Sequence, residues 1–123
     1  MEFDQLSGQV IGCALQVHKI LGPGMLESAY EECMTYELIS NGLEVYRQKP
    51  VPIVYKQIKL ECGYRLDILV NHKIIVELKS IEAIAPVHEA QILTYMRFSK
   101  INIGLLINFN VTSLKNGIKR YVL

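Results

Sequence analysis

The stretch 66-LDILVNHKIIVELKS-80 predicts two apolar β-strands joined by a short polar turn. Three charged residues interrupt its apolar runs: Asp67, Glu77 and Lys79. Burying an unpaired charge costs several kcal/mol or shifts the pKa of the group until it becomes neutral. We therefore expect these three side chains to have partners or a function.

The length of the turn decides whether the charged side chains meet. Glu77 and Lys79 alternate with Leu78 on one strand, so they point to the same face of the sheet. A loop of two or four residues would pair Asp67 with Val76 and place it on the opposite face. A loop of three or five residues would pair Asp67 with Glu77, with Cβ atoms about 5 Å apart. The register of this hairpin is therefore a functional prediction: we expect an odd loop, or a bulge that has the same effect.

Paired carboxylates in such a hairpin favour a divalent cation. Two carboxylates about 4 Å apart repel by roughly 4 kcal/mol at an effective dielectric constant of about 20. Mg²⁺ prefers one or two protein carboxylates and keeps several waters, and Mn²⁺ also suits oxygen ligands. The backbone carbonyl of Leu78 is a further candidate ligand. Lys79 beside the ion could orient or deprotonate a water, or stabilise charge developing on a phosphorane.

These features point to metal-assisted hydrolysis of a phosphodiester. The same residues also have a purely structural interpretation. Asp67, Glu77 and Lys79 could form a salt-bridge cluster at a sheet edge, because Glu-x-Lys is a common tripeptide.

The rest of the chain predicts a mixed α/β fold. Apolar residues at helical spacing predict helices over 5–20, 25–40 and 87–99, and Asn41-Gly42 ends the second. Apolar and β-branched runs predict strands over 51–55, 60–70, 73–79 and 101–110, with an edge strand formed by IKRYVL at 118–123. The expected order is α-α-β-β-β-α-β-β, a mixed sheet flanked by helices in a single domain of residues 1–123.

Composition narrows the functional classes only slightly. Half of the residues are hydrophobic and a fifth are charged, as in ordinary soluble proteins. No apolar run approaches the roughly 18 to 20 residues of a membrane span, and the N-terminus is acidic where a signal peptide is basic. We therefore expect a cytoplasmic protein without membrane contact. The three cysteines lack zinc-type spacing, and the net charge of +1 neither indicates nor excludes nucleic-acid binding.

The second predicted helix carries an acidic residue at the edge of its apolar face. Glu27 shares a side of the helix with Tyr30, Met34 and Leu38. Its carboxylate is therefore expected at the border of the face that packs on the sheet. Tyr30 itself has two interpretations, a core aromatic whose hydroxyl reaches the edge of the site, or a reactant.

The third predicted helix carries a polar stripe formed by His88, Gln91 and Tyr95, at spacings of three and four residues. A Gln within an apolar helix face needs a polar partner. His88 could belong to the site, and Tyr95 has the same two interpretations as Tyr30. His18, at the end of the first helix, could bond to backbone or border the site.

These elements together resemble the PD-(D/E)XK nuclease superfamily, whose common core is a helix, three strands, a helix and a strand. LGPGMLESAY at 21–30 resembles the signature of its small GxxExxY family, with Gly24, Glu27 and Tyr30 at matching positions and His18 just upstream. YRLDILV and VELKS correspond to the segments with the metal-binding Asp and the E-x-K. HEAQILTYM is similar to the following helix, in which a Gln often completes the site. The resemblance covers about residues 9 to 110.

The resemblance implies a metal-dependent nuclease. Asp67 and Glu77 would bind Mg²⁺ or Mn²⁺, and Lys79 would be catalytic. Glu27 would ligate through water or orient the site, and Gln91 would position Lys79 or the metal-bound water. The residues expected to border the site are His88, Tyr30, Tyr95 and His18.

The implied partner is nucleic acid, DNA or RNA. One site per chain cuts one strand, so duplex cleavage would call for a homodimer or two encounters. The alternative is a non-catalytic module of the same fold that binds nucleic acid or a protein partner. The short chain suggests that no residues are left over for an additional recognition element.

Overall fold

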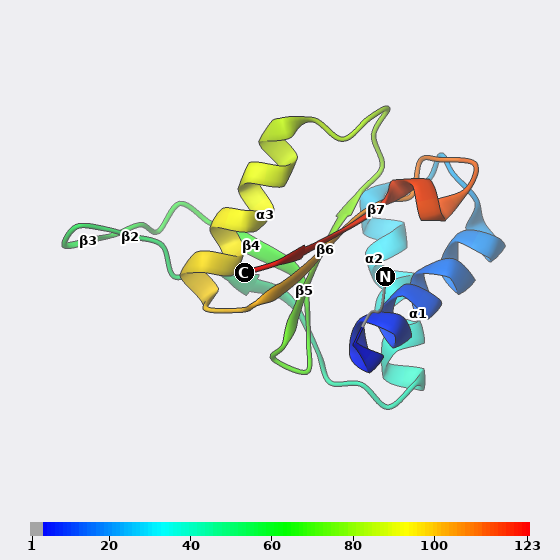
Figure 1. The fold of residues 1–123 in the computed structure, drawn as a ribbon, viewed down its shortest axis with the longest axis horizontal. Coiled ribbons are helices and arrows are strands. Elements are labelled where there is room, and N and C mark those ends of the chain that lie inside the picture. The colour runs from blue at the N-terminus through cyan, green and yellow to red at the C-terminus, as the bar shows by residue number, and fades with distance from the viewer. Residues whose placement is uncertain (1–3) are drawn as a thin grey trace.

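The computed structural model describes residues 4–123, which form a five-stranded mixed sheet between helices (Figure 1). The helices are α1 (Gln5–Leu21), α2 (Glu27–Ser40) and α3 (Pro86–Ser99). The strands of the main sheet are β1 (Val45–Pro50), β4 (Arg65–Val70), β5 (Ile74–Lys79), β6 (Ile103–Asn108) and β7 (Ile118–Val122). A separate hairpin of β2 (Val54–Tyr55) and β3 (Ile58–Lys59) lies between β1 and β4, and the short 3-10 helix η1 (Leu114–Gly117) precedes β7.

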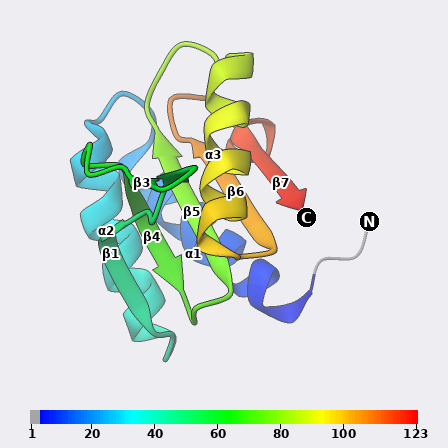
Figure 2. The same cartoon turned by 90° about the vertical axis from the view of Figure 1, so that its left-hand side faces the viewer.

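The strand order across the main sheet is β1-β4-β5-β6-β7. Only β5 and β6 run parallel; the other neighbours are antiparallel. Parallel neighbours need a crossover connection, and α3 provides it. Helices α1 and α2 lie on one face of the sheet and α3 on the other, as Figure 2 shows.

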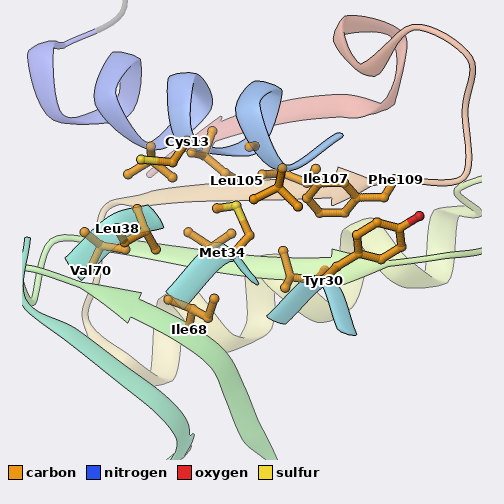
Figure 3. Packing of buried hydrophobic residues seen from close by; sticks show 14 of the residues in the cluster. Cys13, Tyr30, Met34, Leu38, Ile68, Val70, Leu105, Ile107 and Phe109 are labelled. Atoms are coloured by element: carbon orange, nitrogen blue, oxygen red, sulfur yellow. The ribbon is translucent and has the colours of Figure 1, made fainter. Parts of the chain in front are cut away.

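The core consists of two apolar clusters, one on each face of the sheet. Between the sheet and α1 and α2, residues such as Met34, Ile68 and Ile107 pack together (Figure 3). On the α3 side, Met96 packs with residues such as Leu106. Strand β6 contributes to both clusters because its side chains alternate between faces. Its nearly continuous apolar run therefore reflects a central strand that is covered on both faces.

The predicted mixed fold and its helices are confirmed. Helix α1 begins after Asp4, whose carboxylate accepts a hydrogen bond from the backbone N–H of Ser7 at 3.0 Å. Gly22 follows the helix with φ of 68°, in the left-handed region that glycine adopts easily. Helix α2 ends at Asn41-Gly42, where Gly42 has φ of 78°. The expected domain included residues 1–3, which lie outside the described residues.

The predicted strand over 51–55 is wrong. The first strand of the main sheet is β1, at Val45–Pro50, and only 54–55 form a strand, in the separate hairpin. Pro50 and Pro52 lack the N–H groups that would continue the ladder. Strand β1 is an edge strand with mostly exposed side chains, so no apolar pattern identifies it. The predicted strand over 60–70 is likewise shorter, beginning at Arg65.

Within residues 4–123, no helix combines the length and the apolar character that crossing a lipid bilayer requires.

Candidate active site

The turn between β4 and β5 has three residues, which places Asp67 opposite Glu77. Val70 pairs with Ile74 across Asn71–Lys73, and the register continues to Ile68 opposite Val76. The next residues in this register are Asp67 and Glu77. The prediction of an odd loop is therefore confirmed. Asn71 and His72 have φ of 52° and 55°, so the turn reverses the chain within these few residues.

Beyond the Ile68–Val76 pair, the two acidic side chains bond to the facing backbone. The backbone N–H of Asp67 donates to Oε1 of Glu77 at 3.2 Å. The backbone N–H of Leu78 donates to Oδ2 of Asp67 at 2.8 Å. Each carboxylate thus accepts a main-chain N–H from the opposite strand. The two groups are held side by side, with Glu77 only 4% exposed and Asp67 half-buried.

The sheet is distorted at this point. Strands β1 and β4 pair on either side of Asp67, but Gln48, which stands opposite it, forms no ladder pair and has φ of 51°. Leu66 packs on the α3 side and Ile68 on the α1–α2 side, although residues two apart in a regular strand share a face. A positive φ outside glycine is uncommon and frequently occurs at functional sites. The side chains of β4 therefore change the face of the sheet on which they pack at Asp67.

Burial makes ionisation of this carboxyl pair unfavourable. Burial raises the pKa of Glu77 to about 9, and the negative charge of Asp67 adds to that rise. Burial also raises the pKa of Asp67, while the hydrogen bond from Leu78 opposes the increase. The positive charge of Lys79 lowers the pKa of both carboxyl groups, but by less than burial raises it. The pair thus lies where an added positive charge would be strongly stabilising.

The N-terminal part of α2 borders the same place. A hollow of about 240 Å³ lies beside Asp67 and Leu78. Its other walls come from α2 and β1, through Glu27, Ser28, Glu31 and Gln48. The helix and the β4–β5 hairpin therefore bring acidic side chains to one hollow.

Glu27 ties α2 to the end of β5. The side chain of Glu27 is exposed, and its Oε2 accepts a hydrogen bond from the backbone N–H of Ser80 at 3.2 Å. The hydroxyl of Ser80 donates to the carbonyl of Met25 at 2.6 Å. Two contacts thus hold the first residue of α2 and the loop before it against the residue that follows Lys79.

Tyr30 closes the loop that precedes α2. Its hydroxyl donates to the carbonyl of Gly22 at 2.5 Å and accepts from the backbone N–H of Met25 at 3.2 Å. Its ring is fully buried and stacks on Phe109, with centroids 4.3 Å apart (Figure 3). The backbone N–H of Phe109 in turn donates to the carbonyl of Lys79 at 2.9 Å. Tyr30 is therefore a core aromatic that links the loop to the end of β5.

His18 lies beside Phe109, the second ring of this aromatic pair. Its Nε2 is 2.8 Å from the carbonyl of Val111, and its ring centroid is 6.3 Å from that of Phe109. His18 thus joins the end of α1 to the segment after β6. Its ring nitrogen bonds to backbone, as one of the two interpretations of this helix-end histidine expected.

Helix α3 packs Tyr95 in the same buried cluster as Leu66 and Ile75, which lie next to Asp67 and two residues before Glu77. Burial and then the charge of Glu77 raise the pKa of Tyr95, which is 6% exposed. His88 is engaged locally, because its Nδ1 accepts the backbone N–H of Ala85 at 2.9 Å. Gln91 is half-buried and, within residues 4–123, its side chain has no hydrogen-bond partner. In the described part of the chain, neither His88 nor Gln91 lines the hollow beside Asp67.

Sequence reasoning missed Glu31 and Gln48. The charge of Glu31 contributes to the raised pKa of Asp67, and Glu31 also forms an ion pair with Arg47 at 3.1 Å. The amide of Gln48 donates to Oε1 of Glu31 at 2.6 Å. The spacing of four between Glu27 and Glu31 puts both on one helix face and could have indicated Glu31. Nothing in the local sequence marks Gln48, because its position depends on the pairing of β1 with β4.

The donor atoms fit a hard cation. Carboxylate oxygens of Asp67 and Glu77 are the ligands that Mg²⁺ and Mn²⁺ prefer, and one or two of them suffice for Mg²⁺. Within residues 4–123, no three His, Cys, Asp or Glu side chains form a group that could hold a metal ion. The protein would therefore contribute two carboxylates, and water, backbone or substrate oxygens would complete the coordination shell.

Comparisons with known proteins agree with this architecture. The family model of the PD-(D/E)XK nuclease superfamily matches residues 4–121. Searches of curated proteins and of solved structures returned no significant match. The match covers nearly the whole chain, including all the elements that bring the carboxylates together. The protein belongs to the PD-(D/E)XK nuclease superfamily.

Proposed function

We propose that this protein is a divalent-metal-dependent nuclease that hydrolyses phosphodiester bonds in nucleic acid. The observation that carries the proposal is the pair of buried, adjacent carboxyl groups of Asp67 and Glu77, each bonded to the backbone of the facing strand. A buried acidic pair costs stability unless a positive charge joins it. Membership in a nuclease superfamily supports the same conclusion.

Asp67 and Glu77 would hold Mg²⁺ or Mn²⁺ through their carboxylate oxygens. The ion would supply a polarised phosphoryl oxygen and a water of lowered pKa. The hydrogen bonds from Leu78 to Asp67 and from Asp67 to Glu77 fix both carboxylates before substrate arrives. Such preorganisation reduces the cost of arranging the site in the transition state.

The other residues would act on the water and the phosphate. Lys79, two residues beyond Glu77 on β5, would place its ammonium near the attacked phosphate and stabilise the developing charge there. Gln91 has a side-chain amide without a partner in residues 4–123, which leaves it able to orient Lys79 or the attacking water. Glu27 would contribute through a water or by holding the end of β5.

We further propose that the chain is of the GxxExxY type within the superfamily. Gly24, Glu27 and Tyr30 match that signature. The contacts of two of them support a shared role: Tyr30 bonds to both ends of the loop, and Glu27 bonds to Ser80. In this proposal the signature fastens the start of α2 against the catalytic strand.

A non-catalytic module that binds nucleic acid is the second candidate. It is favoured by the small number of acidic ligands, because residues 4–123 hold no group of three metal-binding side chains. Activity as a nuclease on duplexes would also need two chains or two encounters, since each chain carries one such site.

Isothermal titration of Mg²⁺ and Mn²⁺ tests the proposal. The titration compares the unmodified protein, an Asp67→Asn/Glu77→Gln variant, and a Glu32→Gln/Glu44→Gln control that loses the same charge from exposed positions. We expect binding that disappears in the first variant and persists in the control. Cleavage of labelled single- and double-stranded DNA and RNA should follow the same pattern. Metal binding that survives in the first variant would contradict this assignment. Binding without cleavage of any of the four substrates would favour the non-catalytic module.

A further inference from the structure

Residues 51–64 form an arm outside the main sheet. The arm leaves the sheet where β1 ends at Pro50 and returns where β4 begins at Arg65. Figure 1 shows β2 and β3 projecting from the body on the side opposite α1, and Figure 2 shows them in front of the sheet on the α3 side. The structure thus sets apart a segment that chain length alone had not suggested.

The base of the arm is fixed. Val51 and Ile53 are 5% and 9% exposed and pack in the α3-side cluster, with Leu60 partly buried against it. The backbone N–H of Val51 donates to the carbonyl of Tyr64, and that of Leu60 to Ile53, both at 2.9 Å. The arm therefore projects in a direction set by buried contacts.

The tip of the arm exposes apolar side chains. Tyr55 and Ile58 pair across the hairpin and are each 60% exposed, and Val54 is 47% exposed. A cluster of exposed apolar residues on a short projecting hairpin indicates a binding surface. The ammonium of Lys56 lies 5.6 Å from the ring centroid of Tyr55, so aromatic and basic groups occur together.

Charge is concentrated in the same part of the chain. The arm and the residue that follows it, residues 51–65, contain three basic side chains (Lys56, Lys59 and Arg65) and one acidic side chain (Glu61), whereas the rest of the chain contains ten basic and eleven acidic ones. The small overall charge of +1 hides this asymmetry. A locally basic segment with exposed tyrosines complements a polyanion that carries accessible aromatic bases.

The arm also lies next to the candidate active site. Arg65 at its base precedes Asp67 by two residues, and a hollow of about 360 Å³ there is lined in part by Lys59, Tyr64 and Arg65. The ring of Tyr64, which is 44% exposed, meets Tyr95 edge-on with centroids 6.3 Å apart. Tyr95 in turn packs in the same buried cluster as Ile75 of β5, the strand that carries Glu77. A nucleic-acid strand bound by the arm would therefore lie close to the carboxyl pair.

We propose that the arm of residues 51–64 binds a single-stranded segment of the nucleic-acid substrate. Tyr55 and Tyr64 would stack on bases, and Lys56 and Lys59, together with Arg65 at the start of β4, would contact phosphates. This inference rests on the proposed function, since it names the form of the substrate at that site. Stacking on tyrosine requires unpaired bases, which is why a single strand is the ligand and a duplex is not.

Fluorescence anisotropy with labelled 20-nucleotide single-stranded DNA and RNA tests the arm, in EDTA so that no cleavage occurs. A Lys56→Glu/Lys59→Glu variant is compared with a Lys73→Glu/Lys115→Glu control that changes net charge equally at exposed positions elsewhere. We expect the arm variant to bind about tenfold or more weakly, with a salt slope smaller by about 1.4, which corresponds to two lost phosphate contacts. The control should change binding less than threefold.

A second pair of variants tests stacking. Tyr55→Ser should weaken binding of the single strand about tenfold, and Tyr55→Phe should bind like the unmodified protein. The exposed ring lies outside the core, so neither change should alter the melting temperature. Equal losses in the arm and control variants, or equal binding of a 20-base-pair duplex, would overturn the proposal. So would a dimer in analytical ultracentrifugation that only the arm variants dissociate, because the arm would then bind a second copy of the chain.

Cleavage measured in Mg²⁺ separates this inference from the proposed function. Arm-dependent binding without any cleavage would support the arm and contradict the nuclease. Cleavage whose kcat/KM is unchanged in both arm variants would support the nuclease and overturn the arm.

Discussion

Oε2 of Glu27 accepts a hydrogen bond from the backbone N–H of Ser80 at 3.2 Å, which joins the first residue of α2 to the residue after β5. Glu27 is exposed, so this bond contributes little to stability. The bond instead fixes the position of Ser80, which directly follows Lys79. The contact explains how a residue on a distant helix can influence the end of the strand that carries Glu77 and Lys79.

Two substitutions of Glu27 should distinguish the effect of its negative charge from the effect of its hydrogen bond to Ser80. Gln retains an oxygen that accepts the N–H of Ser80, whereas Ala does not. We expect Glu27→Ala to lower kcat/KM about 10- to 100-fold, with the melting temperature within about 2 °C of the original because the site is exposed. If position alone matters, Glu27→Gln should restore most of the activity. Glu32→Ala on the same helix is the control, and a loss of activity there equal to that of Glu27→Ala would contradict the assignment.

Glu77 should make the metal-free protein less stable as the pH rises. Its pKa is about 9 in the folded chain, above the ordinary value of 4.5, so the folded state holds a proton that the unfolded state releases. The protonated carboxyl of Glu77 therefore makes its full contribution to the free energy of unfolding below about pH 4.5, and this contribution is lost as the pH rises toward 9. In EDTA, Glu77→Gln should therefore raise the melting temperature at pH 8 more than at pH 5. Parallel melting curves at both pH values would contradict this prediction.

Added Mg²⁺ should reverse the effect of pH on the unmodified protein. The cation replaces the proton as the positive charge beside the pair, so the melting temperature at pH 8 should rise with metal concentration. Glu77→Gln should show little or no rise. Thermal melts at several concentrations of Mg²⁺ measure this, and equal shifts in both proteins would place the bound metal elsewhere.

Tyr30→Phe should loosen the loop before α2. The buried hydroxyl donates a hydrogen bond to the carbonyl of Gly22 and accepts one from the backbone N–H of Met25. Its loss leaves both backbone groups without that partner and should cost about 1–3 kcal/mol in the free energy of unfolding. Urea denaturation followed by circular dichroism measures the change. Tyr36→Phe, at a position 70% exposed, is the control and should be neutral.

Asp4 should stabilise α1 most strongly above about pH 4. Hydrogen bonds from Ser7, together with the charge of Arg120, lower the pKa of Asp4 to about 2. A carboxyl whose pKa is lowered on folding contributes stability above the ordinary value of 3.8, and this is lost as the pH falls toward 2. Asp4→Ala should cost about 1 kcal/mol at pH 6 by loss of the helix cap. Asp4→Asn keeps a capping oxygen and should be less sensitive between pH 5 and pH 2. An unchanged acid sensitivity would contradict the role of the Asp4 charge.

Local sequence was sufficient for the helices and for the charged residues of the β4–β5 hairpin. Helix boundaries follow from apolar spacing and from punctuation such as Asn41-Gly42, both of which act within one or two turns of the chain. Asp67, Glu77 and Lys79 stand out because charges in apolar strands are costly wherever the strands pack. The mixed sheet follows from the same reasoning, since β6 is apolar on both faces.

Tertiary structure alone decided how these residues meet. The turn at 71–73 was compatible with odd or even loops, and only the pairing of Val70 with Ile74 placed Asp67 opposite Glu77. Strand β1 has no apolar pattern because it is an exposed edge, and it exists as a strand through its hydrogen bonds to β4. The contact of Glu27 with Ser80 spans 53 positions. Periodicity reports which face of an element is buried, but long-range pairing selects among registers and contacts of similar local free energy, and that choice belongs to the folded chain as a whole.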